Sequence, residues 1–258
     1  MGCNFVKTRR NILRIKKSTD RGHVNHGWLD SYHSFSFTGY YNPAQMNFSV
    51  LRVINEDIID PAEGFAMHPH KNMEIITYIL QGELRHEDSL VNSSDIKAGD
   101  VQCMTAGTGV LHSEYNASDI DKVHMLQIWI FPDMKLLEPS YSVKNFKYAQ
   151  KKDRWCLIVS GDGRECSLKI HQDISLFATI LNENKLLEYL LHQNRSTYVQ
   201  VVRGDVEING HILETGDAVM LDGSSIEDGA MLVFKSITQV ELLLFDLPLH
   251  ESIDILQQ

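Results

Sequence analysis

Short runs of apolar and β-branched residues, separated by turn residues, recur along the chain and predict strands. Each run is bounded by Gly, Asn, Asp or Pro, a pattern typical of β-strands. Examples are Phe48–Ile54, Glu74–Leu80, Lys122–Phe131 and Thr197–Val202. The best helical candidate, Ile174–Leu191, is broken by Asn182–Asn184 and is predicted to form two strands joined by a turn. The chain is therefore predicted to be all-β, as in sandwiches and barrels.

A repeated pattern divides the chain into two similar halves. In each half a strand is followed by a turn glycine, a second strand and a Gly-Asp turn, at Gly82 and Gly99 in the first half and at Gly204 and Gly216 in the second. Glycine supplies the positive φ that such turns require. We predict two antiparallel barrels, residues 1–140 with a short extension at 1–12, and residues 141–258, joined near Pro132–Tyr148, where prolines interrupt the strand pattern.

Composition and charge narrow the class of protein. Apolar residues make up 43% of the 258 residues and charged residues 22%, which is typical of a globular chain. The formal net charge of −10 disfavours direct nucleic-acid binding, because such a surface repels phosphate. No apolar run is long enough to predict a membrane span. The four cysteines form no C-x-x-C pair, which fits a reducing compartment and predicts a cytoplasmic location.

Two short triplets carry residue types that bind transition metals. His68-Pro69-His70 precedes a predicted strand, and His112-Ser113-Glu114 follows a glycine-rich turn. Residues i and i+2 of an extended chain point to the same side, so each triplet presents two ligand-type side chains on one face. Two such pairs facing each other across a barrel form a four-ligand cage. Imidazole and carboxylate together suit iron, manganese, nickel, copper or zinc. Because a chain of this length folds without a structural metal, such an ion is expected to be functional.

The spacing around these triplets resembles the two cupin motifs. The first motif is matched by Gly64-x3-His68-x-His70-x3-Glu74-x7-Gly82 and the second by Gly99-x5-Thr105-x-Gly107-x4-His112-x3-Asn116. Three departures from the general cupin pattern are a shorter first spacer, Thr105 where proline is common, and one extra residue before His112.

Those departures, together with several local segments, resemble the pirin family specifically. The segments are Arg21-Gly22-His23-x2-His26-Gly27-Trp28, His33-Ser34-Phe35-Ser36-Phe37, Thr105-Ala106-Gly107-Thr108-Gly109 and His112-Ser113-Glu114-Tyr115-Asn116. The resemblance extends from about Lys16 to Pro248. It implies a bicupin, in which two antiparallel, jelly-roll-like β-barrels pack face to face and the N-terminal barrel holds a single metal.

The resemblance also implies a ligand set. Pirins hold their metal by three histidines and one glutamate, which correspond to His68, His70, His112 and Glu114. A more general cupin takes its glutamate from the first motif, at Glu74. Both carboxylates have the parity expected for the inner face, so the residues alone leave the choice open. The pirin pattern favours Glu114 and leaves Glu74 beside the site or at the surface.

Some pirins resemble cupin dioxygenases, which open the central ring of the flavonol quercetin with O2 and release carbon monoxide. The chain is accordingly predicted to be a quercetin 2,3-dioxygenase-type oxidoreductase that uses one divalent metal. Fe(II) is preferred, with Mn, Ni, Cu, Co or Zn as alternatives. Glu114 is expected to act as ligand and as general base toward the flavonol 3-hydroxyl. Phe48, Phe65 and Met67 are candidate apolar walls for the substrate, with ordinary barrel core as the alternative interpretation.

A different class of function stays open on the same ligands. Pirin-like proteins also include redox-responsive regulators that bind protein partners without turnover, and a barrel that only binds metal is a third option. An enzyme predicts O2 consumption with loss of flavonol, whereas a regulator predicts partner affinity. A monomer is expected, because a bicupin already makes internally the contact that single cupins make by dimerising.

The second barrel is predicted to be free of metal. Aligning the turn glycines of the two halves places the equivalents of the four ligands at Leu190, His192, Gly229 and Met231, only one of which is a ligand type.

The remaining histidines and the cysteine are expected to be structural. His23, His26 and His33 belong to a turn-rich segment and are expected to form hydrogen bonds. His124 is expected to be buried and hydrogen-bonded, with an approach to the metal as the alternative. Cys103 is expected in the core.

Overall fold

The computed structural model describes residues 13–227 and 229–249. Within these ranges almost all regular structure is β-strand, and the one α-helix, α1 (Tyr148–Lys151), has 4 residues. The prediction of an all-β chain is confirmed. No helix in the described ranges has the length and apolar character needed to cross a membrane. The extension predicted at residues 1–12 lies outside the described residues.

The N-terminal half consists of two facing antiparallel sheets. The larger has the strand order β12-β9-β6-β11-β4-β3-β2, and the smaller has the order β5-β10-β7-β8. The strands of the larger sheet are β2 (Gly22–Asn25), β3 (Leu29–His33), β4 (Leu51–Ile59), β6 (Glu74–Gln81), β9 (Asp100–Thr105), β11 (Val123–Ile130) and β12 (Ser140–Asn145). Those of the smaller sheet are β5 (Gly64–His70), β7 (Glu83–Asp88), β8 (Ser93–Lys97) and β10 (Val110–Asn116).

The C-terminal half repeats this arrangement. Its larger sheet has the order β1-β20-β17-β22-β15-β13-β14, and its smaller sheet the order β16-β21-β18-β19. The larger sheet contains β1 (Arg14–Lys16), β13 (Cys156–Ser160), β14 (Leu168–Lys169), β15 (Ser175–Leu181), β17 (Arg195–Arg203), β20 (Ala218–Leu221) and β22 (Val240–Pro248). The smaller contains β16 (Leu186–Leu190), β18 (Val206–Ile208), β19 (His211–Leu213) and β21 (Met231–Ser236).

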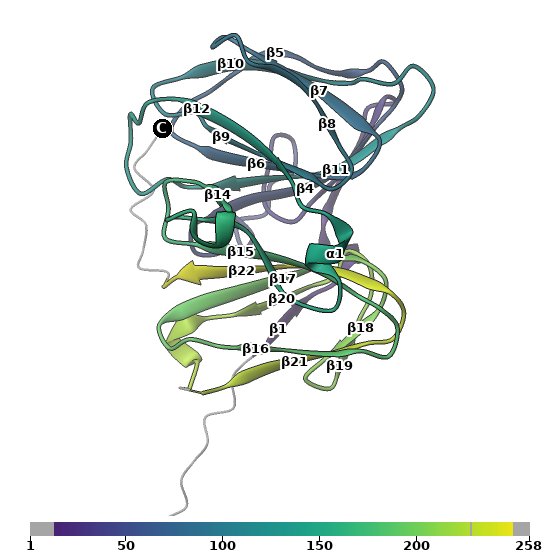
Figure 1. Ribbon diagram of the computed structural model, residues 1–258, viewed down its shortest axis with the longest axis vertical. Helices are drawn as coiled ribbons and strands as arrows, with labels where there is room; N and C mark the ends of the chain where they lie inside the picture. The colour runs from purple at the N-terminus through teal and green to yellow at the C-terminus, as the bar shows by residue number, and fades with distance from the viewer. Residues whose placement is uncertain (1–12, 228, 250–258) are drawn as a thin grey trace, which may run out of the picture.

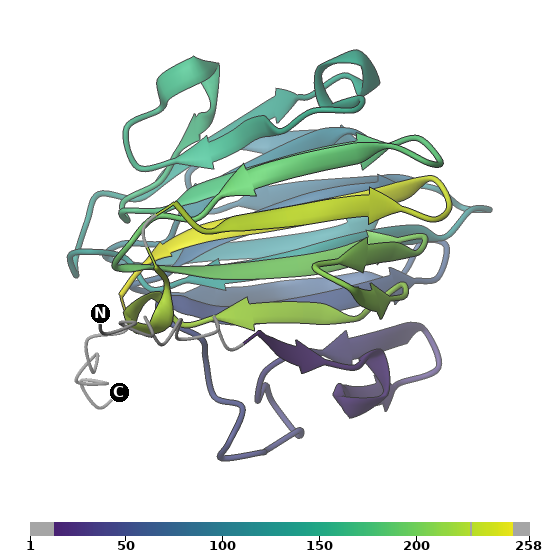
Figure 2. The same ribbon diagram turned by 90° about the horizontal axis from the view of Figure 1, so that it is seen from below.

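The two halves pack through their larger sheets. Figure 1 shows four layers, with the larger sheets in the middle and the smaller sheets outside, and Figure 2 shows the strands of the stacked sheets running along one another. Alternate side chains of strand β6 pack on opposite faces of the larger sheet. Ile76 and Tyr78 belong to the apolar core between the halves, together with Tyr198 and Phe245 of the C-terminal half. Ile75, with the opposite parity, packs inside the N-terminal half.

Two strands cross the division that the sequence predicts after residue 140. Strand β1 precedes the N-terminal half in the chain but pairs with β20, so it completes the larger sheet of the C-terminal half. Strand β12 follows residue 139 and pairs with β9 of the N-terminal half. The predicted joining segment, residues 132–148, is therefore not free of strand structure, because its prolines lie before β12 and not within it.

The turn glycines of the repeat have the predicted conformation. Gly82 has φ of 79° and Gly204 has φ of 81°, values that other residues adopt only with strain. A Cβ atom on Gly82 would lie 2.6 Å from the carbonyl oxygen of Lys122, and one on Gly204 would lie 2.2 Å from that of Gln239. The same close approach, just before β11 and just before β22, supports the internal repeat.

The predicted strands are largely present. Strands β6, β11 and β17 cover three of the four predicted runs, and the segment 174–191 forms β15 and β16 with a turn between them, as predicted. The fourth run is displaced, since β4 begins at Leu51 and Phe48 lies before it. Phe48 instead packs in the core between the halves, 6.1 Å from the ring of Tyr198.

Candidate metal centre

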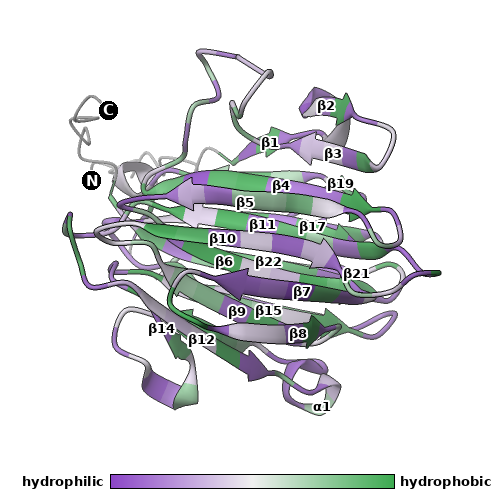
Figure 3. Cartoon of the chain, turned by 90° about the horizontal axis from the view of Figure 1, so that it is seen from above, coloured by the Kyte–Doolittle hydropathy of each residue, from purple (hydrophilic) through white to green (hydrophobic). Residues whose placement is uncertain are grey.

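The two metal-binding triplets lie on neighbouring strands of the smaller N-terminal sheet. Strand β5 carries His68 and His70, β10 carries His112 and Glu114, and the two strands pair with His112 opposite His68. A bulge between His112 and Glu114 shifts the register, so that Glu114 lies opposite Phe65. Figure 3 looks onto this sheet, where β5 and β10 run beside each other.

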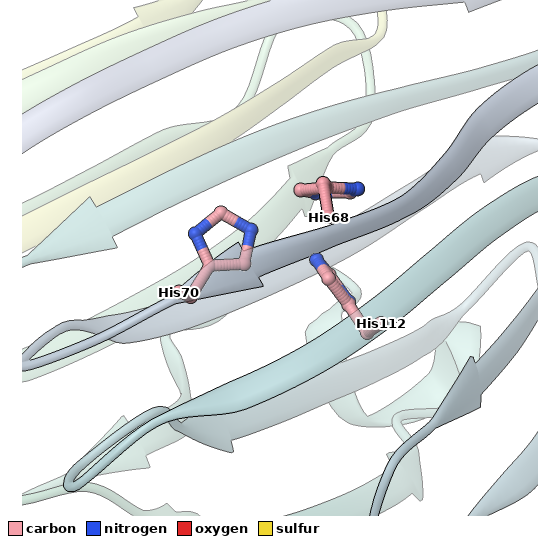
Figure 4. Close-up of side chains that lie close together, drawn as sticks. All are labelled: His68, His70 and His112. Carbon is pink, nitrogen blue, oxygen red and sulfur yellow. The ribbon is translucent and has the colours of Figure 1, made fainter.

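Three imidazoles converge from these strands. The ring centroids of His68 and His112 are 4.4 Å apart, those of His70 and His112 are 4.7 Å apart, and those of His68 and His70 are 4.8 Å apart. Each ring offers one nitrogen, and the three nitrogens lie within 4.8 Å of one another. Figure 4 shows the three rings gathered over the paired strands. The expected convergence of the two triplets is therefore present for these histidines.

The hydrogen bonds of the cluster leave nitrogen lone pairs for a metal. Nδ1 of His68 lies 2.8 Å from the carbonyl oxygen of Ala66, which can only accept, so Nδ1 donates and Nε2 keeps its lone pair. Nε2 of His112 is buried and has no hydrogen-bond partner. Burial, together with the neighbouring imidazoles, lowers the pKa of His70 and of His112 to about 3, so both rings are neutral at physiological pH. Neutral imidazoles with free nitrogens fit a divalent transition metal.

Glu114 is held beside this cluster by the opposite sheet. Gln127 donates from Nε2 to Glu114 Oε2 at 2.9 Å, while the hydroxyl oxygen of Thr77 lies 3.5 Å from Oε1. Glu114, His112 and His86 of β7 form a second group, in which the ligand atoms lie within 4.8 Å of one another. The structure thus gives two overlapping groups that share His112. It does not place all four predicted ligands in one group, and Glu114 remains a predicted ligand.

Four buried polar residues line the larger sheet beneath the cluster. Asn55 of β4 pairs with Gln127 of β11, Gln127 pairs with Thr77 of β6, and Thr77 pairs with Gln102 of β9. We call these four residues the polar row. Thr77 donates to Gln127 Oε1 at 3.2 Å and accepts from Gln102 Nε2 at 3.3 Å. The row reaches Glu114 and therefore fixes where its carboxylate lies.

Sequence reasoning missed His86, Asp88 and the polar row. His86 and Asp88 form a third triplet of the same i, i+2 type, on the strand that pairs with β10, and this parity was a usable signal. Gln127 carried a weaker signal, because it is a polar residue within the apolar run of β11. The hydrogen bonds that join these residues connect different strands, so no local pattern indicates them.

Glu74 does not lie on the inner face, and the prediction of that parity is wrong. It shares its face of β6 with Ile76 and Tyr78, which pack between the halves, and it accepts a hydrogen bond from Thr105 at 2.8 Å. The chain turns between β5 and β6 and passes from one sheet to the other, so the alternation counted from His70 does not continue across the turn. Burial raises the pKa of Glu74 to about 7.

Only one of the three candidate substrate-wall residues lies near the histidines. Phe65 lies close to the cluster, with its ring centroid 6.3 Å from that of His68. Met67 is 54% exposed and has the opposite parity on β5, and Phe48 lies between the halves, so the structure brings neither to the histidines. Trp129 of β11 contacts His70 edge-on at 5.0 Å, and its buried Nε1 has no hydrogen-bond partner.

Three of the other histidines, His23, His33 and His124, are held by carboxylates or a hydroxyl. His23 lies 2.6 Å from Asp30, and buried His33 lies 2.8 Å from the hydroxyl of Ser31. His124 lies 2.9 Å from Glu56 and shares the parity of Leu126, which faces the C-terminal half, so it does not approach the cluster. Hydrogen bonding was the main expectation for these residues, and Cys103 is buried as predicted.

The C-terminal half has an apolar interior at the corresponding level. Phe177 of β15 pairs with Leu244 of β22, Leu244 pairs with Val199 of β17, and Val199 pairs with Val219 of β20. We call these four residues the apolar row. Both groups of His, Cys, Asp and Glu that could hold a metal lie in the N-terminal half, as far as the described residues extend. Two of the positions expected to match the ligands, Leu190 and Met231, are exposed.

Comparison with family models places most of the chain. Residues 14–130 match the model described as Pirin, and residues 157–247 match the model described as the quercetinase C-terminal cupin domain.

Curated proteins of similar sequence match this chain over nearly their whole length. Quercetin 2,3-dioxygenase of Escherichia coli strain K12 is 44% identical over 237 residues, which span 92% of this chain and 99% of that protein. A pirin-like protein of Caulobacter vibrioides is 38% identical over 226 residues, which span 87% and 95% of the two chains.

Solved structures show the same similarity. The crystal structure of YhhW from E. coli matches with a TM-score of 0.86 at 42% identity, over 92% of this chain and 98% of that chain. The structure of bacterial pirin YhhW in complex with nickel(II) matches with a TM-score of 0.85 at 42% identity, over 92% of this chain and 100% of that chain.

Proposed function

The chain belongs to the pirin family, and on this basis we propose that it is a metal-dependent flavonol dioxygenase of the quercetin 2,3-dioxygenase type. Family membership also confirms the predicted bicupin fold. The observation that carries the proposal is the convergence of three histidines, His68, His70 and His112, beside a buried carboxylate. The relative from E. coli K12 bears the name of this activity.

The three histidines and Glu114 are the residues that would hold the metal. His68 and His112 present free Nε2 atoms, and Glu114 adds a carboxylate oxygen next to His112. When bound, a divalent transition metal supplies a Lewis acid for the flavonol oxygen and a redox centre for O2. We propose Fe(II) as the resident metal; the YhhW structure with nickel(II) supports a divalent ion of this series.

Glu114 is placed to remove the proton of the flavonol 3-hydroxyl. Gln127 holds Oε2 at 2.9 Å, while Oε1 has only the long contact to Thr77, so Oε1 is the oxygen free to accept the proton. Glu114 is 1% exposed, so its carboxylate is shielded from bulk water. Loss of this proton makes the flavonol ring electron-rich, which favours its reaction with O2.

Phe65 and Trp129 are proposed to position the flat substrate. Phe65 packs edge-on to Trp28 and lies near His68, while Trp129 contacts His70 from the opposite sheet. Aromatic rings at these two places exclude water from the ligand and favour stacking or edge contacts with it. The unpartnered Nε1 of Trp129 offers a hydrogen-bond donor to a flavonol hydroxyl.

Oxygen uptake tests the proposal. Protein loaded separately with Fe(II), Mn(II) or Ni(II) is mixed with quercetin in an oxygen electrode, and carbon monoxide is trapped. We expect uptake with loss of the flavonol absorbance in at least one metal form, and its abolition in His68→Ala. His211→Ala, which removes an exposed histidine of the C-terminal half, is the matched control. If no metal form takes up oxygen, the dioxygenase assignment is wrong and a regulator without turnover replaces it.

The division of labour between the halves is part of the same proposal. We propose that residues 141–258 bind no metal and that the chain acts as a cytoplasmic monomer with one ion. Elemental analysis of the purified protein together with its mass in solution tests both statements. Two ions per chain would contradict the first statement, and a stable dimer would contradict the second.

A further inference from the structure

We propose that His86, held by Asp88, is a positioning residue that fixes His112 in the tautomer able to bind the metal through Nε2. This inference rests on the proposed metal site but concerns two residues outside the predicted ligand set. It assigns a role to two inward side chains of β7, His86, which reaches the cluster, and Asp88, which bonds to His86.

The strand register places these residues side by side. Strands β7 and β10 pair with His112 opposite Asp88 and Glu114 opposite His86. Nδ1 of His86 lies 3.4 Å from Nδ1 of His112, and Nε2 of His86 lies 3.2 Å from Asp88 Oδ2. A chain of contacts therefore runs from the Asp88 carboxylate through His86 to His112.

Hydrogen-bond chemistry assigns the protons along this chain. A carboxylate only accepts, so Nε2 of His86 carries the proton that Asp88 accepts. A neutral imidazole has one N–H, so Nδ1 of His86 is then an acceptor. Nδ1 of His112 must donate to it, because two lone pairs facing each other repel. Nε2 of His112 is left with its lone pair, and this is the buried atom that has no partner within the protein.

His86 is held so that it cannot easily rotate away. Asp88 Oδ1 accepts from the backbone N–H groups of Leu90 and Asn92, and Oδ2 accepts from the Asn92 side chain. On its other side the His86 ring stacks on Tyr141, with centroids 4.5 Å apart and planes 20° apart. Side chains of His86 and Asp88 are fully buried. The ring is thus clamped between a rigid turn and an aromatic face.

The same contacts join the two ends of the site. Tyr141 donates to Gln102 Oε1 at 2.9 Å, and Gln102 belongs to the polar row that holds Glu114. His112 and Glu114 are therefore held by one connected set of buried residues. An imidazole that donates its second N–H is a more basic ligand, and losing such a partner typically lowers metal affinity about 10–100-fold.

Nitrogen NMR of the imidazole rings tests the assignment directly. In the metal-free wild-type protein labelled with 15N-histidine, we expect His112 to carry its proton on Nδ1. In His86→Phe, which keeps the ring but removes the acceptor, we expect a mixture of tautomers or the Nε2–H form. The affinity for Ni(II), measured by chelator competition, should fall about 10–100-fold in the same variant.

Two further variants separate positioning from folding. His86→Asn places an amide oxygen near Nδ1 and should recover part of the affinity lost in His86→Phe. His124→Phe is the matched control. It removes a histidine of the larger N-terminal sheet that bonds to Glu56 and faces away from the cluster, and this variant should bind Ni(II) like the wild type. If His86→Phe does not fold, the wild-type spectrum and His86→Asn still decide the question.

Either of two results would overturn the proposal. The first is a wild-type His112 that carries its proton on Nε2. The second is a folded His86→Phe with unchanged tautomer and unchanged Ni(II) affinity. Failure of the proposed function looks different, because it appears as a wild-type protein that neither binds metal nor consumes oxygen, whereas the tautomer is read without metal.

Discussion

The two halves of the molecule have the same arrangement of sheets. They differ in the polarity of one row of residues in the larger sheet, which is the polar row in the N-terminal half and the apolar row in the C-terminal half. Thr77 and Val199 each precede their turn glycine, Gly82 or Gly204, by five positions. Gln127 pairs with Thr77, and Leu244 pairs with Val199, so Gln127 and Leu244 occupy equivalent positions in the two halves. The N-terminal half therefore has polar side chains where the C-terminal half has apolar ones.

The difference shows which part of the design serves chemistry and which serves stability. Buried amides and hydroxyls cost free energy unless they are hydrogen-bonded, and Thr77, Gln127 and Gln102 of the polar row are bonded to one another, to Glu114 and to Tyr141. The apolar row packs with Leu232 and Phe234 of β21 and gains the full benefit of burial. One framework thus supports a reactive interior in one half and a stable core in the other.

The largest effect is expected from placing the N-terminal residue in the C-terminal half. Leu244→Gln removes a fully buried aliphatic side chain and buries an amide without partners, so the free energy of unfolding should fall by about 4 kcal/mol. Urea denaturation measures the loss. Leu186→Asn, at a position that is 67% exposed, is the control and should change stability by less than about 0.5 kcal/mol. A tolerated Leu244→Gln would mean that the apolar row is not the basis of the contrast.

Removing a histidine should lower the affinity for metal only when that histidine belongs to the N-terminal cluster. His70→Ala should weaken Ni(II) binding roughly 100-fold, about 3 kcal/mol, because one of the converging nitrogens is lost. Isothermal titration measures the change. His192→Ala, at an exposed position of the C-terminal half, should bind as tightly as the wild type. Equal losses in the two variants would show that the metal does not depend on the N-terminal cluster.

A pH dependence is expected from the face between the halves. Burial raises the pKa of Glu74 to about 7 in the folded chain, so the folded state binds this proton more tightly than the unfolded state. Its contribution to stability is therefore greatest in acid and is lost as the pH rises through about 7. Glu74→Gln, which can still accept from Thr105, should be more stable than the wild type at pH 8 by on the order of 2 kcal/mol and should show little gain at pH 4. Thermal melts at both pH values check this, and an equal difference at the two would rule it out.

The smallest effect is expected from the reciprocal exchange. Gln127→Leu places the C-terminal residue in the polar row, so Glu114 Oε2 loses its 2.9 Å donor while the packing volume is retained. The free energy of unfolding should fall by about 1 kcal/mol, because a buried carboxylate oxygen is left without its donor, and kcat for quercetin should fall roughly tenfold, as the carboxylate is no longer held in place. Steady-state kinetics with circular dichroism measures both quantities. Gln127→Glu tests charge separately, since it places a second carboxylate beside Glu114.

Local pattern predicted the strands and the convergence of the three histidines well, and for physical reasons. Alternation within one strand placed His68 with His70 and, across a single bulge, His112 with Glu114. The same rule failed for Glu74, because the chain changes sheets between β5 and β6 and parity is reset at the turn. A period of two is reliable only as far as the strand continues.

Features that depend on pairing between distant strands were beyond the sequence. Phe48 and the metal segment are close in the chain, yet Phe48 packs against Tyr198 of the other half. His86 contacts His112 only because β7 pairs with β10, and Tyr141 stacks on His86 only because β12 joins the first half. Each of these contacts is set by the arrangement of the sheets.

Strand β1 imposes an order on how the chain can be completed. It precedes the N-terminal half in the chain, yet the backbone N–H of Ser18 just after it bonds to Asp217, 199 positions further along. Strand β1 therefore cannot pair until β20 has been synthesised. The larger sheet of the C-terminal half is thus completed by a strand from before the N-terminal half, so the C-terminal half does not form from a contiguous stretch of chain.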